Sequence, residues 1–90
     1  MALGSTAMYQ IVRSPKQLGT VIRRERRQRS WTQSHLASLT GLRQEFISKI
    51  ETGQEGTKLA TIYAIFAALE LELVVEQRNP DQAPGVEDVF

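Results

Sequence analysis

Residues 32–53 contain two short amphipathic segments on either side of a glycine-containing turn. Thr32 can cap a first helix, and Gly41 can adopt the left-handed conformation that ends it. A second helix is expected from Arg43 to about Glu51. Apolar residues that would fill the small core between these helices are Leu36, Ala37, Ile47 and Ile50. Two short helices around such a turn predict a helix-turn-helix unit.

Further helices are expected on both sides of this unit. Ser14 can cap a helix that runs to about residue 29, with Pro15 at its first position and Gln17 completing a capping box. After a polar loop, Thr57 is expected to cap a fourth helix that ends near Leu69. This fourth helix is apolar over more than one face, so we expect it to pack on its own domain and on a second subunit.

From Glu70 the apolar period changes to two, which predicts one β-strand. A lone strand leaves its backbone groups unpaired, and pairing with the same strand of a second chain satisfies them. The fold class is therefore all-α, a bundle of about four helices plus one C-terminal β-strand that pairs across a dimer. The expected dimerisation residues are Tyr63, Phe66, Leu71, Leu73 and Val75.

Three parts are expected along the chain. Residues 1–12 would form a flexible N-terminus, and residues 13–77 the helix-turn-helix domain with its dimerisation strand. Residues 78–90 have the composition of a disordered acidic tail, although they end in an apolar aromatic.

Charge is distributed unevenly between the two halves. Before residue 50 there are nine Lys or Arg and two Glu, a balance of +7, whereas residues 50–90 carry a balance of −6. A basic front half suggests a polyanion as one partner, and the alternative is a set of solvated faces of alternating sign. The arginines of residues 23–29 are interpreted as a helix surface that adds long-range attraction to DNA.

Several classes of function have no support in the sequence. The chain has no cysteine, its one histidine (His35) stands alone, and no two carboxylates share a convincing pocket. There is no glycine-rich phosphate loop, no apolar run long enough to span a bilayer and no signal-peptide pattern at the N-terminus. We expect a cytoplasmic non-enzyme with no metal, no cofactor, no catalytic residue and no membrane partner.

The exposed positions of the second helix of the unit carry side chains that can read base edges. Arginine suits guanine, glutamine suits adenine and glutamate accepts from the cytosine amino group. The exposed residues are Arg43, Gln44, Glu45, Ser48 and Lys49. Solvated surface is the alternative interpretation of each.

The segment "WTQSHLASLTGL…FISKIETG" resembles the phage-repressor type of helix-turn-helix domain, of the Cro/C1 or Xre-like kind, over about residues 15–70. A closer likeness spans nearly the whole chain. "SPKQLGTVIRRERRQRSWTQSHLASLTGLRQEFIS", then "LATIYAIFAALELELVVEQ" and an apolar aromatic terminus, is similar to the HipB-type antitoxins that pair with HipA serine/threonine kinase toxins.

This resemblance implies a homodimer that binds palindromic operators in its own promoter and neutralises a HipA-like kinase toxin. The base contacts it implies are Arg43, Gln44, Glu45 and Ser48. The phosphate contacts it implies are Thr32, Gln33, Ser34 and Lys49. Val89 and Phe90 would form a toxin-binding plug at the end of the tail.

Two positions depart from the family pattern. Glu45 stands where a small residue is common, and Arg43 stands where Ser or Thr is frequent, so the operator sequence can differ. Two alternatives stay open: a free-standing phage-type or metabolic repressor without a toxin, and a protein-binding adaptor that no longer binds DNA. The basic front half argues against the adaptor.

Overall fold

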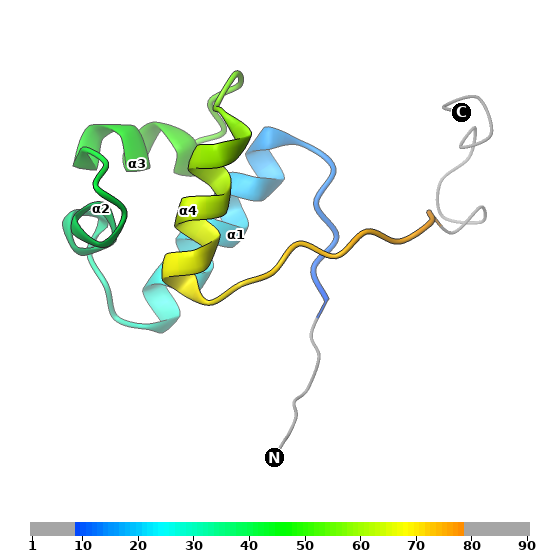
Figure 1. Cartoon of the computed structure of the whole chain (residues 1–90), viewed down its shortest axis with the longest axis horizontal. Coiled ribbons are helices and arrows are strands. Elements are labelled where there is room, and N and C mark those ends of the chain that lie inside the picture. Colours follow the sequence, from blue (N-terminus) through cyan, green and yellow to red (C-terminus); the bar gives the residue numbers. More distant parts are fainter. Residues whose placement is uncertain (1–8, 79–90) are drawn as a thin grey trace, which may run out of the picture.

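The computed structural model describes residues 9–78 and contains four helices in that part of the chain. They are α1 (Pro15–Gln28), α2 (Gln33–Thr40), α3 (Gln44–Glu51) and α4 (Leu59–Leu69). Helix α3 packs against α1 and α2, and α4 covers α1 and α2 (Figure 1). The expected helical bundle is thereby confirmed. Among the described helices, none is long and apolar enough to cross a membrane.

The expected starts of α1 and α2 are confirmed by side-chain caps. The Ser14 hydroxyl accepts a hydrogen bond from the Gln17 backbone N–H at 3.1 Å, and Pro15 occupies the first helical position. The Gln17 side chain reaches back to the backbone N–H of Arg13, one residue before the position of a capping box. Thr32 caps α2 by accepting from the His35 N–H at 2.9 Å. Each cap satisfies a helix N–H that has no intrahelical partner.

The start of α4 differs from expectation. Thr57 does not cap it, because Lys58 is the extended N-cap residue (ψ 140°) and makes no side-chain cap hydrogen bond. The Thr57 hydroxyl instead accepts from Gln54 within the preceding loop. Helix α2 ends as expected, at Gly41 in the left-handed conformation (φ 75°). The sequence therefore predicted the end of α2 correctly. It predicted the N-cap of α4 at Thr57, one residue before the observed N-cap, Lys58.

A single apolar core holds the four helices together. The expected core residues of α2 and α3 are buried, and residues of α1 and α4 complete the cluster. Its members are Ile22, Leu36, Ala37, Ile47, Ile50, Ile62, Ile65, Phe66 and Leu69. Gly19 brings the backbones of α1 and α3 together, since a Cβ there would lie 2.4 Å from the Ile50 carbonyl oxygen. The backbones of α1 and α3 are therefore in direct contact at Gly19.

The segment after α4 leaves the bundle. Glu70 takes a left-handed conformation (φ 59°), and residues 71–78 continue as irregular chain past the N-terminal residues (Figure 1). No β-strand occurs among residues 9–78, because one chain offers this segment no neighbouring strand. The expected strand pairing across a dimer stays a prediction.

Candidate nucleic-acid interface

A buried ion pair joins α1 to the last residue of α3. The Arg26 guanidinium donates to both carboxylate oxygens of Glu51, at 2.7 and 3.0 Å, and to the Trp31 carbonyl oxygen at 2.7 Å. Both residues are buried, at 7% and 3% exposure. The hydrogen bond to Glu51 raises the pKa of Arg26 above its ordinary value, so this arginine stays charged. The two helices are therefore joined by a bidentate contact as well as by apolar packing.

This pair corrects the interpretation of residues 23–29 as a solvated arginine surface. Arg26 is buried, and Arg29 donates to the Leu69 carbonyl oxygen at 2.6 Å and to Glu25 at 2.9 Å. Arg23 lies 3.8 Å from Glu51, and Arg24 bonds the side chain of Gln10. Arg27 is exposed and remains available to a polyanion. Part of the basic cluster is structural, so long-range attraction rests on fewer charges than the sequence suggests.

The carboxylate of Glu51 continues into a chain of amides that reaches the N-terminal end of α3. Gln33, the first residue of α2, donates to Glu51 Oε1 at 3.1 Å. Its Oε1 accepts from Gln44 Nε2 at 2.6 Å, and Gln44 is the first residue of α3. We call Arg26, Glu51, Gln33 and Gln44 the polar chain. It restrains the side chain of Gln44, one of the predicted base-contact residues.

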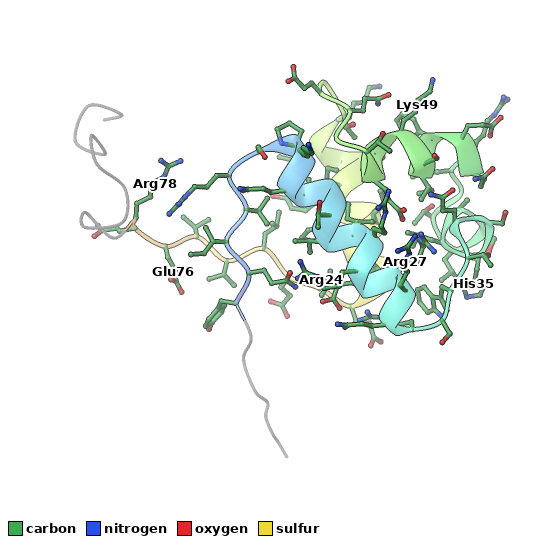
Figure 2. All side chains as sticks on the ribbon, turned by 180° about the vertical axis from the view of Figure 1, so that it is seen from behind. Arg24, Arg27, His35, Lys49, Glu76 and Arg78 are labelled. Carbon is green, nitrogen blue, oxygen red and sulfur yellow. The ribbon has the colours of Figure 1, made fainter. Side chains whose placement is uncertain are left out.

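The outer face of α3 has the composition expected of a reading surface. Arg43, Gln44, Glu45 and Lys49 are exposed and Ser48 is half-buried. Arg43 is the N-cap residue of α3, and its guanidinium makes no capping hydrogen bond to the helix. Figure 2 shows Lys49 extending from α3 into solvent, on the helix that carries the other four side chains. The fold therefore brings all predicted base-contact residues to one helix surface.

Two further features bear on the predicted contacts. Glu45 lies in the first turn of α3, where a carboxylate interacts favourably with the helix dipole whether or not it meets a base. Thr32 caps α2, Ser34 is exposed beside it, and the half-buried Gln33 spends one N–H on Glu51. Its second N–H remains for a phosphate oxygen. Three of the four predicted phosphate contacts thus lie at the N-terminus of α2, and the fourth, Lys49, lies on α3.

Trp31 packs against the core and does not stack as a free aromatic. It is half-buried, its ring meets His35 edge-on at 4.8 Å, and the Arg29 guanidinium lies 5.9 Å from the ring centre. His35 has no further histidine, cysteine or carboxylate around it that could complete a metal site among the described residues. Trp31 is therefore a packing residue just before α2.

The predicted dimerisation residues fall into two groups. Tyr63, Leu73 and Val75 are exposed, and Val75 is 97% exposed. Phe66 is buried in the core of its own chain and Leu71 is half-buried against it, so each has little surface left for a partner. The predicted plug residues Val89 and Phe90 lie outside the described residues.

The Arg26–Glu51 pair and the Gln33–Gln44 contact were not predicted from the sequence. A signal for the first exists: Leu18, Ile22 and Arg26 follow at intervals of four, so Arg26 continues the buried stripe of α1. The contact between the two glutamines had no such signal, because it depends on how α2 and α3 cross.

Comparison with known proteins agrees with this geometry. A helix-turn-helix family model matches residues 22–75. The antitoxin HipB of Escherichia coli strain K12 is 37% identical over 67 residues, which are 74% of this chain and 76% of HipB. Its counterpart in Escherichia coli O6:H1 has the same identity, with 71% of its length covered.

Solved structures give the same result. This chain superposes with a TM-score of 0.73 and 35% identity on HipB in a HipA-HipB-O2-O3 complex, over 79% of this chain and 100% of that one. A HipB-O4 20mer complex gives the same values. The controller protein C.AhdI of a restriction-modification system from Aeromonas hydrophila matches with a TM-score of 0.61 and 29% identity, over 64% of this chain and 88% of that one. The chain described here belongs to the HipB antitoxin family of helix-turn-helix proteins.

Proposed function

We propose that this protein is a DNA-binding antitoxin and transcriptional autorepressor. It binds operator DNA as a homodimer and neutralises a HipA-like serine/threonine kinase toxin, acting in the cytoplasm without catalysis of its own. The observation that carries the DNA-binding part is the outer face of α3, where an oriented Gln44 stands beside Arg43, Glu45 and Lys49.

In this proposal the α2 N-terminus and Lys49 set the position of the protein on the phosphate backbone. Thr32, Gln33 and Ser34 contact one stretch of the DNA phosphate backbone. Backbone N–H groups at the start of α2 donate further hydrogen bonds to these phosphates. Side chains of α3 then discriminate bases in the major groove. The proposed base contacts are Arg43, Gln44, Glu45 and Ser48.

A dimer places two such units on successive major grooves. The half-sites would lie about 34 Å apart, or a multiple of this, because one turn of B-DNA separates equivalent groove positions. Tyr63, Leu73 and Val75 are exposed apolar side chains that a second chain would cover. Repression follows from occupancy of a promoter by the bound dimer.

The toxin-binding part rests on family membership and on solved HipA-HipB assemblies of relatives. We propose that Val89 and Phe90 enter an apolar pocket on the kinase. An acidic tail ending in an aromatic can reach a distant site, although its ordering opposes binding.

Selection from a randomised double-stranded DNA library, followed by affinity measurement with the full chain, tests DNA binding. We expect enrichment of a palindromic sequence, and loss of enrichment when Arg43→Ala and Gln44→Ala are combined. Gln28→Ala is the matched control, since Gln28 is an exposed glutamine at the end of α1. If the unmodified chain enriches no sequence, it is not a sequence-specific DNA-binding protein.

Purification of the tagged native chain from its own cells tests the toxin partner. We expect a larger kinase to co-purify, and removal of residues 86–90 to abolish its neutralisation while DNA affinity stays the same. Neutralisation that survives the truncation would reject the plug. A chain that represses its promoter and brings down no kinase would instead be a free-standing repressor.

A further inference from the structure

The N-terminal residues 9–13 are placed against the bundle, and we call them the arm. Gln10 holds the arm to α1 by donating to Glu25 at 3.1 Å and accepting from Arg24. Tyr9 and Ile11, the two neighbours of Gln10 in sequence, are 70% and 65% exposed. Two large apolar side chains are therefore presented to solvent by an anchored backbone.

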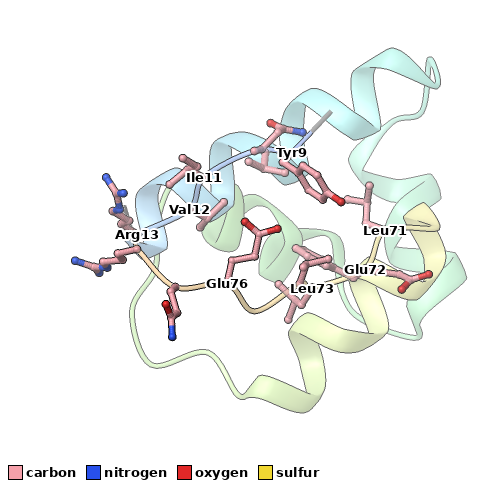
Figure 3. Close-up of a pocket in the computed structure, with 14 residues that line it drawn as sticks. Tyr9, Ile11, Val12, Arg13, Leu71, Glu72, Leu73 and Glu76 are labelled. Atoms are coloured by element: carbon pink, nitrogen blue, oxygen red, sulfur yellow. The ribbon is translucent and has the colours of Figure 1, made fainter. Parts of the chain in front are cut away.

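An open groove of about 460 Å³ lies between the arm and residues 71–78, the C-terminal segment. Figure 3 shows Ile11, Val12 and Arg13 on one side of it and Leu73 and Glu76 on the other. Val74 is also exposed there, at 57%. Exposed apolar groups that gather along one groove indicate a surface that a partner covers.

The charges of this groove have no ion-pair partners within the part of the chain that the structure describes. Arg13 and Arg78 line it together with Glu72 and Glu76, yet none of the four makes an ion pair among residues 9–78. A second copy of the same chain brings the same four charges in a reversed order, so two-fold symmetry can place each arginine beside a carboxylate of the partner. The groove is therefore complementary to itself in charge as well as in apolar surface.

We propose that the arm of each chain covers the outer edge of the partner's C-terminal segment in the dimer, so that this segment lies in the groove. The inference rests on the homodimer of the proposed function and extends it. Paired segments alone would form a two-stranded ribbon with both outer edges open, and open edges are prone to wrong pairing. The arm of each chain lies along the outer side of the partner's segment and covers that edge. The dimer contact then consists of arm and segment from each chain, with Ile11 against the partner chain and Arg13 facing its acidic residues.

Crosslinking can test this contact directly, because the chain has no cysteine. One chain carries Ile11→Cys and a second, larger tagged chain carries Val75→Cys; the two are mixed under mild oxidation. We expect a disulfide between chains of different size. A Leu39→Cys chain is the control, since Leu39 is equally apolar and 50% exposed but lies on α2. The proposal is overturned if Leu39→Cys crosslinks to Val75→Cys as efficiently as Ile11→Cys does, or if Ile11→Cys forms no crosslink.

Charge reversal gives a second measurement in the full chain. By sedimentation equilibrium at low salt, Arg13→Glu and Glu76→Arg should each weaken dimerisation about tenfold, because the groove occurs twice per dimer. Their combination should return the dissociation constant to within about threefold of the unmodified value. Arg27→Glu, on the exposed side of α1, should leave dimerisation unchanged. If the double variant dimerises as weakly as the sum of the two single effects predicts, the proposal is overturned.

The two levels of inference fail in different ways. A chain that is monomeric at every concentration removes the homodimer of the proposed function. A chain that dimerises normally after Ile11→Ser, with unchanged helical content and thermal unfolding, keeps the homodimer and removes the arm from it.

Discussion

The polar chain and the groove both contain charged and amide groups. These groups are hydrogen-bonded within one molecule in the polar chain, whereas the charges of the groove are left unpaired in the described part of the chain. Each polar member of the polar chain finds its partner inside one molecule, and no buried side-chain nitrogen or oxygen among the described residues lacks a hydrogen bond. The groove leaves four charges without an ion pair, and several apolar side chains exposed, among residues 9–78. The outer face of α3 is thus fully supported within the monomer, whereas the groove needs a second copy of the chain to pair its charges.

The largest effect is expected from Glu51→Ala, which breaks the polar chain at its buried end. Arg26 would keep its charge without a carboxylate partner, a loss of about 3–5 kcal/mol in the free energy of unfolding. Urea unfolding followed by circular dichroism measures this. Glu45→Ala, on the exposed side of the same helix, should change stability by less than about 0.5 kcal/mol. Similar losses in the two variants would show that the buried pair adds nothing.

Gly19→Ala tests the backbone contact behind the reading helix. The added Cβ would meet the Ile50 carbonyl oxygen at 2.4 Å, so α1 and α3 must separate. Overpacking of this kind destabilises by about 1–3 kcal/mol. The change in thermal unfolding should be accompanied by weaker DNA binding, since α3 is displaced. Arg27→Ala, an exposed alanine substitution on α1, provides the comparison, and unchanged stability in Gly19→Ala would contradict the close approach.

Gln44→Ala should act on DNA recognition and leave stability nearly unchanged. We expect a loss of about 1–3 kcal/mol on the selected sequence and reduced discrimination at one base pair. Fluorescence anisotropy with matched and substituted duplexes measures both quantities. Gln33→Ala should reproduce part of this loss, and the double variant should be less than additive because the two side chains act through one contact. Strict additivity would mean that the glutamines act independently.

Lys49→Ala should weaken binding to all sequences alike. Removal of one phosphate contact lowers the slope of log affinity against log salt by about one. Titrations at several salt concentrations measure this slope. The matched variant is Lys58→Ala, at the start of α4, which should leave the slope unaltered. A slope that does not change in Lys49→Ala would exclude its phosphate role.

The smallest effect on the isolated chain is expected from Val75→Ala. Val75 is 97% exposed, so the free energy of unfolding of dilute monomer should change by less than about 0.5 kcal/mol. The dependence of the unfolding temperature on protein concentration should nevertheless become weaker, because dimerisation stabilises the folded chain by mass action. Differential scanning calorimetry over a hundredfold range of concentration checks this. A large loss in dilute solution would place Val75 inside the monomer's structure.

Much of the fold could be predicted because local signals determine it. Ser14 and Thr32 cap helices through their own hydroxyls, and Gly41 ends α2 by its own backbone freedom. The cap of α4 was misplaced because Thr57, a suitable residue type, is used by a loop contact with Gln54. Contacts between elements distant in sequence are not determined locally, which is why the link from Glu51 to Gln33 was not predicted.

The same distinction applies to the arm. Its composition carries no helix or strand period, so residues 1–12 were expected to be flexible. The arm is held mainly through the side chain of Gln10, whose partners on α1 lie 14 and 15 residues further along the chain. A contact of that range depends on the turn of the chain before α1, and no pattern within the arm reports it.

The polar chain also has a direction. The carboxylate of Glu51 can only accept, so Gln33 must turn its N–H₂ toward it and its carbonyl toward Gln44. Gln44 must then turn its own N–H₂ inward, which leaves one N–H and the carbonyl oxygen facing outward. A donor beside an acceptor complements the major-groove edge of adenine, whereas guanine offers two acceptors there. A carboxylate at the far end of α3 thereby decides which hydrogen-bond pattern the first turn of that helix offers to DNA.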